Sequence, residues 1–388
     1  MNTLNLHWLF HASINECFEE QISLTSVDRT ELLAARTTIR AHIRSEVTKR
    51  LKAAKVENAE KISPKFITQG SYAYGTLNAP ARPPRQQADL DDGVYVPLSY
   101  CEDTGSPKTV SRLLLEIIES ILSDLAEQRG WAIDSTNPNC TRLIIARDKH
   151  VDVPIYSIPD DEFRRIAQDR FLLAKDAVSF GEYYLSERLD DDWSLMPSRV
   201  RLAHKVLGWL DSDPRPIKDW VETQVALKSE QLRRLMRYLK AWRDFQQWPE
   251  GDPKSILLMA LVDATLNRKV DGRDDLALIA VCSGIPDALT GSVEIPALPG
   301  EDLAKRLNED GLKDEFIRRV QHLHYTLKHC VQGRHSPEQV CRMLRDQFGS
   351  RFPDRPDRIR LESPEQTVHA TAPRIIAPVP IVGRREAG

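Results

Sequence analysis

The chain lacks any long apolar run. Among its 388 residues no segment approaches 18 consecutive apolar side chains, and the first residues do not follow the charged-then-apolar order of a secretion leader. We therefore expect neither a membrane span nor a signal peptide, and we expect a cytoplasmic protein.

Cysteine is scarce and has no paired spacing. The six cysteines include no CxxC pair, which favours reduced thiols over a disulfide framework. Histidines and cysteines do gather late in the chain, where they could suggest zinc. Their spacing fits no closed tetrahedral site, and exposed helical histidines explain them better. This group consists of His322, His324, His329, Cys330, His335 and Cys341.

An excess of positive charge is also missing. The net charge is −3 and the isoelectric point is near 6.4, so we do not expect the broad basic surface of a protein that grips long nucleic acid. Small nucleotides suit this charge better. With 41% hydrophobic and 29% charged residues, the chain can bury a sizeable core as one or two domains.

Three acids lie on predicted strands. Asp89 and Asp91 flank Leu90, and alternation along a strand sends both carboxylates to one face, about 7 Å apart. Asp152 lies inside a second apolar, β-rich run at 150–156, where an unpaired charge would be costly to bury. A pair of magnesium ions would supply the partner, because Mg²⁺ takes carboxylate oxygens as ligands.

A short predicted strand at 65–68 runs into Gly70 and Ser71 and then a helix start. Free backbone N–H groups and a hydroxyl at such a turn can hold triphosphate oxygens. Alone, a Gly-Ser turn is usually only a turn, and an Asp-x-Asp is usually a solvated strand edge or a helix cap. In this order, with a third acid on a later strand, the set indicates two-metal nucleotidyl transfer of the polymerase-β-like kind.

Periodicity divides the chain into two lobes and a tail. Residues 1–163 predict an α+β nucleotidyltransferase lobe with a mixed sheet, a brace helix at 26–51 capped by Ser26 or Asp28, and a second helix at 108–129. Residues 164–351 predict a helical lobe that completes the active-site cleft, and the proline-rich residues 352–388 are typical of a largely disordered tail. The helices expected in the second lobe span 164–188, 198–210, 217–225, 229–247, 254–268, 274–282, 301–309, 312–331 and 336–347.

Several motifs resemble those of the bacterial cGAS/DncV-like nucleotidyltransferases, in particular the dinucleotide-cyclase branch. They cover most of residues 8–260 and fade afterwards. Between Arg142 and Asp152 the chain is one residue shorter than the family pattern. The motifs are QGSYAYGTLNAP at 69–80, DLDDGVYVP at 89–97, Arg142, HVDVP at 150–154, YSIP at 156–159, DSDP at 211–214, KAWRD at 240–244 and Ser255-Ile256.

The resemblance implies roles for individual side chains. Asp89, Asp91 and Asp152 would be the catalytic, metal-binding acids, with two Mg²⁺ ions as cofactors and Mn²⁺ as a substitute. Lys240 would reach a triphosphate, although a basic stripe on a helix is by itself typical of a solvated face. Arg142 would contact the acceptor nucleotide by bidentate hydrogen bonds or stacking. The implied nucleotide-binding residues are Gln69, Gly70, Ser71, Tyr74, Arg142, Lys240, Ser255 and Asp302.

The implied activity is synthesis of a cyclic dinucleotide signal from NTPs. ATP and GTP are the expected substrates, and 3′,3′-linked cyclic GMP-AMP is a candidate product, although the bases are not legible in the residues. The implied setting is anti-phage defence (CBASS), with a downstream effector that the cyclic nucleotide activates. Two alternatives stay open: a nucleotidyltransferase that extends RNA or modifies a protein or small molecule, and a non-catalytic nucleotide-binding scaffold.

The last residue, Gly388, suggests conjugation. A terminal glycine is unhindered and can enter the narrow adenylating and thioester-transferring site of an E1/E2-like ligase. The resemblance implies that related enzymes are ligated through this end. We expect Gly388 to be joined to an amine of a target; a flexible end that carries glycine by chance is the competing interpretation.

Overall fold

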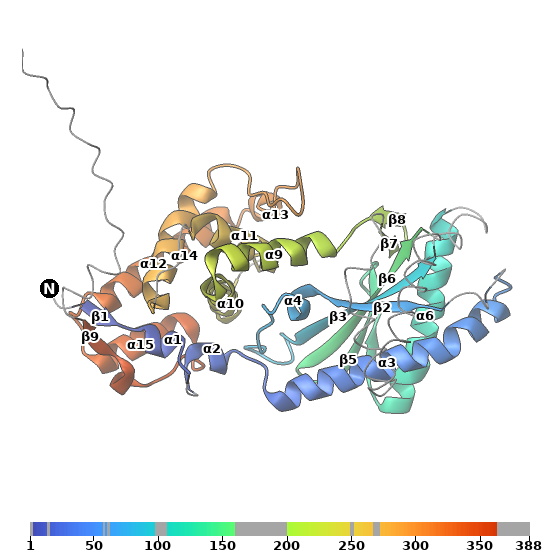
Figure 1. The fold of residues 1–388 in the computed structure, drawn as a ribbon, viewed down its shortest axis with the longest axis horizontal. Coiled ribbons are helices and arrows are strands. Elements are labelled where there is room, and N and C mark those ends of the chain that lie inside the picture. Colours follow the sequence, from blue (N-terminus) through green and yellow to red (C-terminus); the bar gives the residue numbers. More distant parts are fainter. Residues whose placement is uncertain are drawn as a thin grey trace, which may run out of the picture.

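The computed structural model describes residues 3–13, 16–56, 59, 63–97, 107–159, 200–248, 252–266 and 272–362. The helix predicted at 164–188 and the conjugation residue Gly388 lie outside these ranges. The described chain forms two lobes side by side along the long axis of the molecule (Figure 1). One lobe contains the large sheet and the other is helical, as the predicted α+β class requires.

A mixed seven-stranded sheet forms the first lobe. Its order is β2-β3-β6-β5-β4, and a β7–β8 hairpin adds to β6. The central pair β3 and β6 is parallel, and its register sets Asp91 opposite Asp152 and Asp89 opposite His150. The strands are β2 (Lys65–Gln69), β3 (Ala88–Pro97), β4 (Ala132–Asp134), β5 (Cys140–Ala146), β6 (Lys149–Ile158), β7 (Arg201–His204) and β8 (Gly208–Asp211).

Two long helices cover one face of this sheet (Figure 1). They are α3 (Ser26–Ala53) and α6 (Pro107–Arg129). Helix α3 begins with a capping box in which the Thr25 side chain accepts from the backbone of Asp28, so the cap is Thr25 and not Ser26 or Asp28. Leu90, Val94 and Val96 of β3 are buried in one core with both helices. Because side chains alternate along a strand, Asp89 and Asp91 face the opposite side.

A buried ion pair fixes α3 to the central strand. Arg40 donates to both carboxylate oxygens of Asp92, at 2.8 and 2.6 Å, and both side chains are 1% exposed. Arg36 donates to the Thr68 hydroxyl at 2.8 Å on the neighbouring strand β2. The predicted brace therefore holds β2 and β3 in place by hydrogen bonds as well as by apolar contact.

The helical lobe packs around α10. This helix buries Leu232, Leu235, Met236, Leu239 and Trp242, which are the core residues predicted from its period. The helices of the lobe are α9 (Arg215–Lys228), α10 (Glu230–Phe245), α11 (Ser255–Thr265), α12 (Asp274–Ala288), α13 (Lys305–Glu309), α14 (Lys313–Val331) and α15 (Pro337–Phe348). Seven predicted helices are thus confirmed, with shifted ends. None of the described helices is long and apolar enough to cross a membrane.

The first residues of the chain pack with this second lobe, although the sequence division assigned them to the first. Leu6, Leu9 and Phe10 belong to the same core as α10. Leu6 lies between β1 (Thr3–Asn5) and α1 (His7–Phe10), and Leu9 and Phe10 belong to α1; α2 (Phe18–Gln21) follows. The N-terminal segment therefore crosses from the helical lobe to the brace helix and ties the two lobes together.

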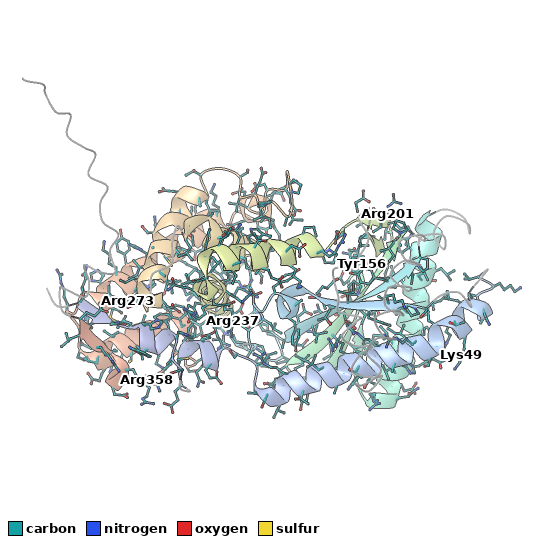
Figure 2. All side chains as sticks on the ribbon, viewed as in Figure 1. Lys49, Tyr156, Arg201, Arg237, Arg273 and Arg358 are labelled. Atoms are coloured by element: carbon teal, nitrogen blue, oxygen red, sulfur yellow. The ribbon has the colours of Figure 1, made fainter. Side chains whose placement is uncertain are left out.

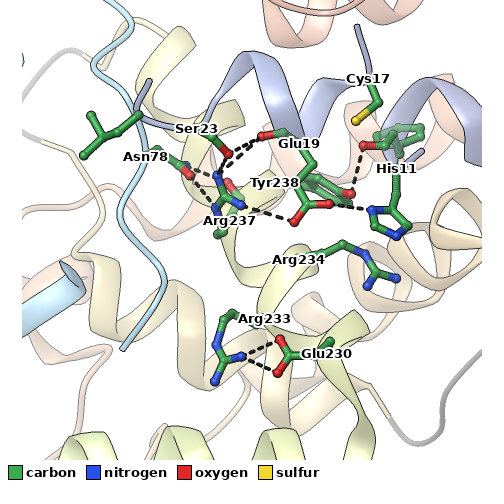
Figure 3. Close-up of polar contacts among 12 residues, drawn as sticks. His11, Cys17, Glu19, Ser23, Asn78, Glu230, Arg233, Arg234, Arg237 and Tyr238 are labelled. Carbon is green, nitrogen blue, oxygen red and sulfur yellow. Dashed lines mark hydrogen bonds and ion pairs between the residues drawn. The ribbon is translucent and has the colours of Figure 1, made fainter. Parts of the chain in front are cut away.

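Arg237 is the centre of this tie (Figure 3). From α10 it donates to the Ser23 hydroxyl at 2.7 Å, to the Asn78 side-chain oxygen at 3.1 Å and to Glu19 at 3.3 Å. On the next position of α10, Tyr238 donates to the backbone carbonyl of Phe10 at 3.0 Å. These bonds hold α10, and with it Lys240, against the loop that leaves the Gly70 turn.

The helix predicted at 198–210 is wrong. The segment forms the β7–β8 hairpin, in which Leu202 pairs with Tyr156 at the edge of β6. The turn is closed by backbone N–H groups that donate to His204 Nδ1 and by Gly208 at a φ of +92°. The segment forms strands because pairing with the edge of β6 satisfies its backbone N–H and C=O groups. The local sequence pattern does not show that this edge is available.

The prediction of an extended tail is wrong for residues 352–362, which are ordered; residues 363–388 lie outside the described residues. Phe352 is 1% exposed and packs on Phe10 and Phe348. A short strand β9 (Arg360–Glu362) pairs antiparallel with β1, after the 3₁₀ turn η3 (Pro356–Arg358). This ordered segment depends on a partner strand some 357 residues away in the sequence, so composition alone could not reveal it.

Candidate active site

The parallel register of β3 and β6 brings the predicted acids together on the open face of the sheet. Asp91 lies directly opposite Asp152, and Asp89 lies one alternation earlier on β3. Burial, and then the neighbouring charges of Asp89 and Asp152, raise the pKa of Asp91 well above its usual value. The charged form of Asp91 is therefore disfavoured beside two other carboxylates, and a divalent cation bound there would relieve this repulsion.

Gly70 is required by this cluster. Its φ is +68°, and a Cβ placed on it would lie 1.8 Å from the Asp91 carboxylate oxygen. Any side chain at this position would therefore displace Asp91, in addition to straining the backbone. The predicted turn after β2 thus has two roles: it begins the short helix α4 (Gly70–Ala73), and it leaves room for the Asp91 carboxylate.

Asp152 is held by Arg142 across strands β5 and β6. The guanidinium donates through two nitrogens to the two carboxylate oxygens, at 2.7 and 2.8 Å. This bond raises the pKa of Arg142 further. Arg142 is about one-third exposed, so part of the guanidinium still faces the open side of the sheet. The sequence placed Arg142 at the acceptor nucleotide, and the structure places it beside the acid that the acceptor hydroxyl would meet.

His150 joins the acids, although no sequence argument singled it out. Its Nε2 lies 2.9 Å from Asp89 Oδ1 and 3.8 Å from Asp152 Oδ1. One ligand atom from each of Asp89, His150 and Asp152 lies within 4.8 Å of the others. The sequence did contain a signal for His150. It lies two residues before Asp152, and side chains two residues apart on a strand point to the same face. The carboxylate oxygens of Asp89 and Asp152, together with His150 Nε2, fit a divalent cation.

Gln69 and Tyr74 lie beside the acids, but neither lines the cavity next to Asp89 that is described below. The Gln69 amide donates to the Tyr156 hydroxyl at 2.7 Å and accepts from that of Tyr95 at 3.3 Å. Those two tyrosines stack with centroids 4.8 Å apart and continue the open face of the sheet; Figure 2 labels Tyr156 there. Tyr74 packs against the helical core, and burial followed by the charge of Asp91 raises its pKa.

A cavity of about 280 Å³ opens between the lobes beside Asp89. It brings together Ser71 from the turn, Lys240 from α10 and Ser255 from the first turn of α11, as the resemblance implied. Arg243, which the sequence motif contained but did not single out, also lines it and donates to the Ser255 hydroxyl at 3.3 Å. The cavity is lined by Ser71, Leu77, Asn78, Pro80, Gln86, Gln87, Asp89, Lys240, Arg243, Asp244, Asp252 and Ser255.

Lys240 is not on a solvated face. Its side chain is buried, and Nζ donates to the carbonyl of Thr76 at 2.7 Å. Burial, and then the nearby charge of Arg243, lower the pKa of Lys240 to about 7. No acid among the described residues forms an ion pair with Nζ, so this buried amine at the cavity wall is available to bind an anion.

Asp302 is not brought to this cavity. One of its carboxylate oxygens accepts from the backbone N–H groups of Val293 at 2.9 Å and of Ala304 at 3.0 Å. These bonds close the loop before α13. The Asp302 side chain therefore stabilises its own loop. The geometry does not support its predicted contact with the donor nucleotide.

The sheet, its paired acids and the phosphate-sized cavity beside them define a nucleotidyltransferase. The nucleotidyltransferase domain of the DncV-like cyclic GMP-AMP synthases matches residues 64–156, and the C-terminal domain of cyclic GMP-AMP synthase matches residues 229–359. A cyclic GMP-AMP synthase of Escherichia coli is 32% identical over 302 residues, which are 75% of this chain and 68% of that protein. The chain therefore belongs to the DncV-like cyclic GMP-AMP synthase family.

Further relatives agree on the fold. The cyclic GMP-AMP synthase of Vibrio cholerae serotype O1 is 34% identical over 247 residues, which are 61% of this chain and 55% of that protein. The crystal structure of V. cholerae DncV with the linear intermediate 5′ pppA(3′,5′)pG superposes with a TM-score of 0.72 at 24% identity, covering 94% of this chain and all of that one. DncV with GTP and 5MTHFGLU2 gives 0.71 over the same shares. At this identity the solved structures establish the fold.

Proposed function

We propose that the chain joins two NTPs into a cyclic dinucleotide by two successive phosphodiester-forming reactions in one site. The observation that carries the proposal is the cavity in which Asp89 meets Ser71, Lys240 and Ser255, within a chain of the cyclic GMP-AMP synthase family. The names of the relatives, and the linear intermediate bound to DncV, support ATP and GTP as substrates and 3′,3′-cyclic GMP-AMP as the product.

The donor triphosphate occupies the cavity between the lobes. Ser71 and Ser255 offer hydroxyl donors to its oxygens, and Lys240 offers an ammonium group. Because burial lowers the pKa of Lys240 to about 7, the anionic triphosphate draws a proton onto the amine when it binds. Asp89, Asp91 and Asp152 would hold two Mg²⁺ ions, or Mn²⁺ in their place, which supply charge neutralisation at the α-phosphate and activation of the attacking hydroxyl.

The acceptor nucleotide lies on the open face of the sheet, next to Arg142. The bidentate bond to Arg142 fixes the orientation of the Asp152 carboxylate, which accepts the proton of the attacking ribose hydroxyl. The hydroxyl oxygen bonds to the α-phosphorus of the donor, the bond from that phosphorus to the bridging oxygen breaks, and pyrophosphate leaves. The linear intermediate then turns over, and the same groups close the ring.

Product analysis tests this proposal. The chain is incubated with all four labelled NTPs and Mg²⁺ or Mn²⁺, treated with phosphatase and examined by mass spectrometry. A cyclic dinucleotide has no terminal phosphate and survives the phosphatase, whereas a linear product loses its 5′ phosphates. A ladder of longer products would favour RNA extension, transfer to added protein or small molecules would favour modification, and absence of pyrophosphate release would favour a non-catalytic scaffold; each of these outcomes would refute the proposal.

The proposed biological setting rests on the family resemblance. We propose that the cyclic dinucleotide activates a downstream effector in anti-phage defence, and that synthesis takes place in the cytoplasm, where NTPs are available. Purified product should activate the effector of the same operon in a reconstituted assay. A product without effect on that protein would contradict the proposal.

We also propose that an E1/E2-like ligase joins Gly388 to an amine of a target and so raises signal synthesis. This proposal rests on the sequence and on the family resemblance alone. Co-expression with a neighbouring E1/E2-like protein should give a higher-mass adduct that Gly388→Glu or deletion of the tail removes. An adduct that survives both changes would refute it.

A further inference from the structure

Arg243 is a largely buried arginine of α10 that the proposed mechanism does not use. It lines the cavity beside Lys240, and its side chain is 12% exposed. The guanidinium donates through Nη1 to the carbonyl of Pro253 at 2.7 Å and to the hydroxyl of Ser255 at 3.3 Å. Arg243 therefore joins the last turn of α10 to the residues that begin α11.

The charge of Arg243 is balanced by its neighbour in the sequence, Asp244. Nε donates to Asp244 Oδ1 at 2.7 Å, and Nη2 lies 2.6 Å from the same oxygen. Lys240, by contrast, forms no ion pair with an acid of the described residues. A triphosphate in the cavity therefore finds its free positive charge at Lys240. What Arg243 supplies is geometry, because its N–H donors form a planar fork with fixed directions.

The bond from Arg243 leaves the hydrogen of the Ser255 hydroxyl free. A serine hydroxyl has one hydrogen to donate and two lone pairs that accept. Since the oxygen accepts from Arg243, one lone pair faces α10 and the hydrogen is left for another acceptor. No residue in the described part of the chain accepts it. Because Ser255 lines the cavity, this hydrogen is available to a phosphate oxygen there.

The start of α11 is held by the same arginine. The helix begins at Ser255, and the preceding residue, Lys254, provides no side-chain cap. The first N–H groups of a helix have no acceptor within it and form the positive end of the helix dipole. Arg243 holds the carbonyl of Pro253, two residues before the helix. It therefore fixes the chain that leads into α11 as well as the first hydroxyl of that helix.

We propose that Arg243 is a positioning residue for the donor triphosphate: it orients the Ser255 hydroxyl and holds the start of α11, so that Ser255 donates to a phosphate oxygen. The inference rests on the proposed function for the identity of the ligand. Arg243 acts through Ser255 and needs no contact with the triphosphate itself. A lysine in its place would keep the charge, but a single ammonium group lacks the fork that bonds to Asp244, Pro253 and Ser255 together.

A double-variant cycle tests the inference on the full chain. The ligand is α,β-methylene ATP with Mg²⁺, because its bridging carbon prevents release of pyrophosphate and calorimetry then measures binding without turnover. Ser255→Ala and Arg243→Met should each raise the dissociation constant about tenfold, as expected for loss of a hydrogen bond to a charged group. The double variant should also raise it about tenfold, because Arg243 acts through a hydroxyl that is already absent. A rise of roughly a hundredfold, the product of the single effects, would show that Arg243 binds the triphosphate independently and would overturn the inference.

Two further variants separate positioning from charge and from stability. Arg243→Lys keeps the charge and should still weaken binding about tenfold; full affinity in this variant would overturn the inference, also if Arg243→Met fails to fold. Arg319→Met is the matched control, because Arg319 of α14 likewise donates to a backbone carbonyl, that of Gln247 at 2.7 Å, but does not line the cavity. It should leave the dissociation constant unchanged. An equal loss of affinity in this control would show that any loosening of the helical lobe weakens binding, and would contradict a specific role for Arg243.

Steady-state synthesis gives a second readout. In Arg243→Lys the KM for NTP should rise about tenfold while kcat stays within about threefold, because the Ser255 hydroxyl binds phosphate equally before and during the reaction. A fall in kcat with unchanged KM would count against the inference. Cyclic product together with independent effects of Arg243 and Ser255 on binding would refute this inference alone. Coupled effects on binding without any cyclic product would refute the proposed function alone.

Discussion

The two lobes bring ionisable groups of opposite sign to the site, and each lobe contains one group whose charged form its surroundings disfavour. In the sheet lobe, burial and neighbouring carboxylates raise the pKa of Asp91. In the helical lobe, burial and a neighbouring guanidinium lower the pKa of Lys240 to about 7. Each lobe therefore disfavours the charged form that the reaction uses. Bound cations would stabilise the charged form of Asp91, and a bound triphosphate would stabilise the charged form of Lys240.

The lobes differ in how they position these groups. The acids are near neighbours within two paired strands, and the β-sheet register places them side by side. Lys240 and Ser255 come from two helices and reach the cavity only because α10 is fixed by Arg237 and its partners (Figure 3). Damage to the acids should therefore remove chemistry, whereas damage to the helical side should weaken binding.

The largest effect is expected from the acids of the sheet lobe. Asp89→Ala with Asp91→Ala should lower product formation by on the order of a thousandfold or more, because the charge stabilisation that bound metal supplies is worth several kcal/mol. Steady-state assays of cyclic product measure this. A folded double variant that retains synthesis would refute the two-metal assignment, and Asp211→Asn, at an exposed acid of β8, is the matched control.

The same acids should destabilise the empty protein. The pKa of Asp91 is raised on folding, so its contribution to stability is fully present below the ordinary value of 3.8 and is lost as the pH rises through the raised value. At neutral pH, Asp91→Asn should therefore increase the free energy of unfolding measured in urea without added metal. A decrease would show that the carboxylate contributes to the fold.

The next largest effect concerns the brace of the sheet lobe. Arg40→Met should lower the free energy of unfolding by about 3–5 kcal/mol, because it leaves Asp92 charged and buried without its partner. Adding Asp92→Leu should recover much of the loss, since an apolar pair removes the uncompensated charge. Urea denaturation measures both, and equal stability of the single and double variants would contradict the buried pair.

On the helical side, Lys240→Met should raise the KM for NTP about 10- to 100-fold, as expected for loss of a charge-assisted hydrogen bond worth roughly 1.5–3 kcal/mol. Product identity should not change, because the contact proposed for Lys240 is with phosphate and not with the base. Lys305→Met, at an exposed lysine of the same lobe, is the control. Normal kinetics for Lys240→Met would place the triphosphate elsewhere.

The smallest expected effect is a change in the number of protons bound to the protein when NTP binds. At pH 8 the amine of Lys240 is mostly neutral, so NTP binding should take up about one proton, measurable by calorimetry in buffers of different ionisation enthalpy. In the empty protein, stability should rise as the pH increases from about 7 toward 10.5, because only the unfolded chain keeps that proton. Lys240→Met should remove both effects, and proton uptake that persists in the variant would contradict them.

The catalytic half of the fold was predictable because its evidence is local. Asp89 and Asp91 share a face through the two-residue alternation of one strand, and the Gly70 turn follows directly from the preceding strand. The seven confirmed helices of the second lobe likewise follow from period. The hairpin at 201–211 and the strand at 360–362 were missed, because each forms against an edge supplied by a distant strand.

Sequence by itself determined the chemistry of this protein: the three acids, the turn beside them and the family motifs that include Lys240. Tertiary structure decided which of those groups meet. The β3–β6 register places His150 beside the acids. The packing of α10 buries the amine of Lys240 at the cavity wall, although the sequence pattern alone is typical of a solvated basic stripe. The bonds of Asp302 to two backbone N–H groups kept it out of the site. The physical reason is that residue type and local spacing set what a side chain can do, whereas burial and non-local pairing set its partners and its charge.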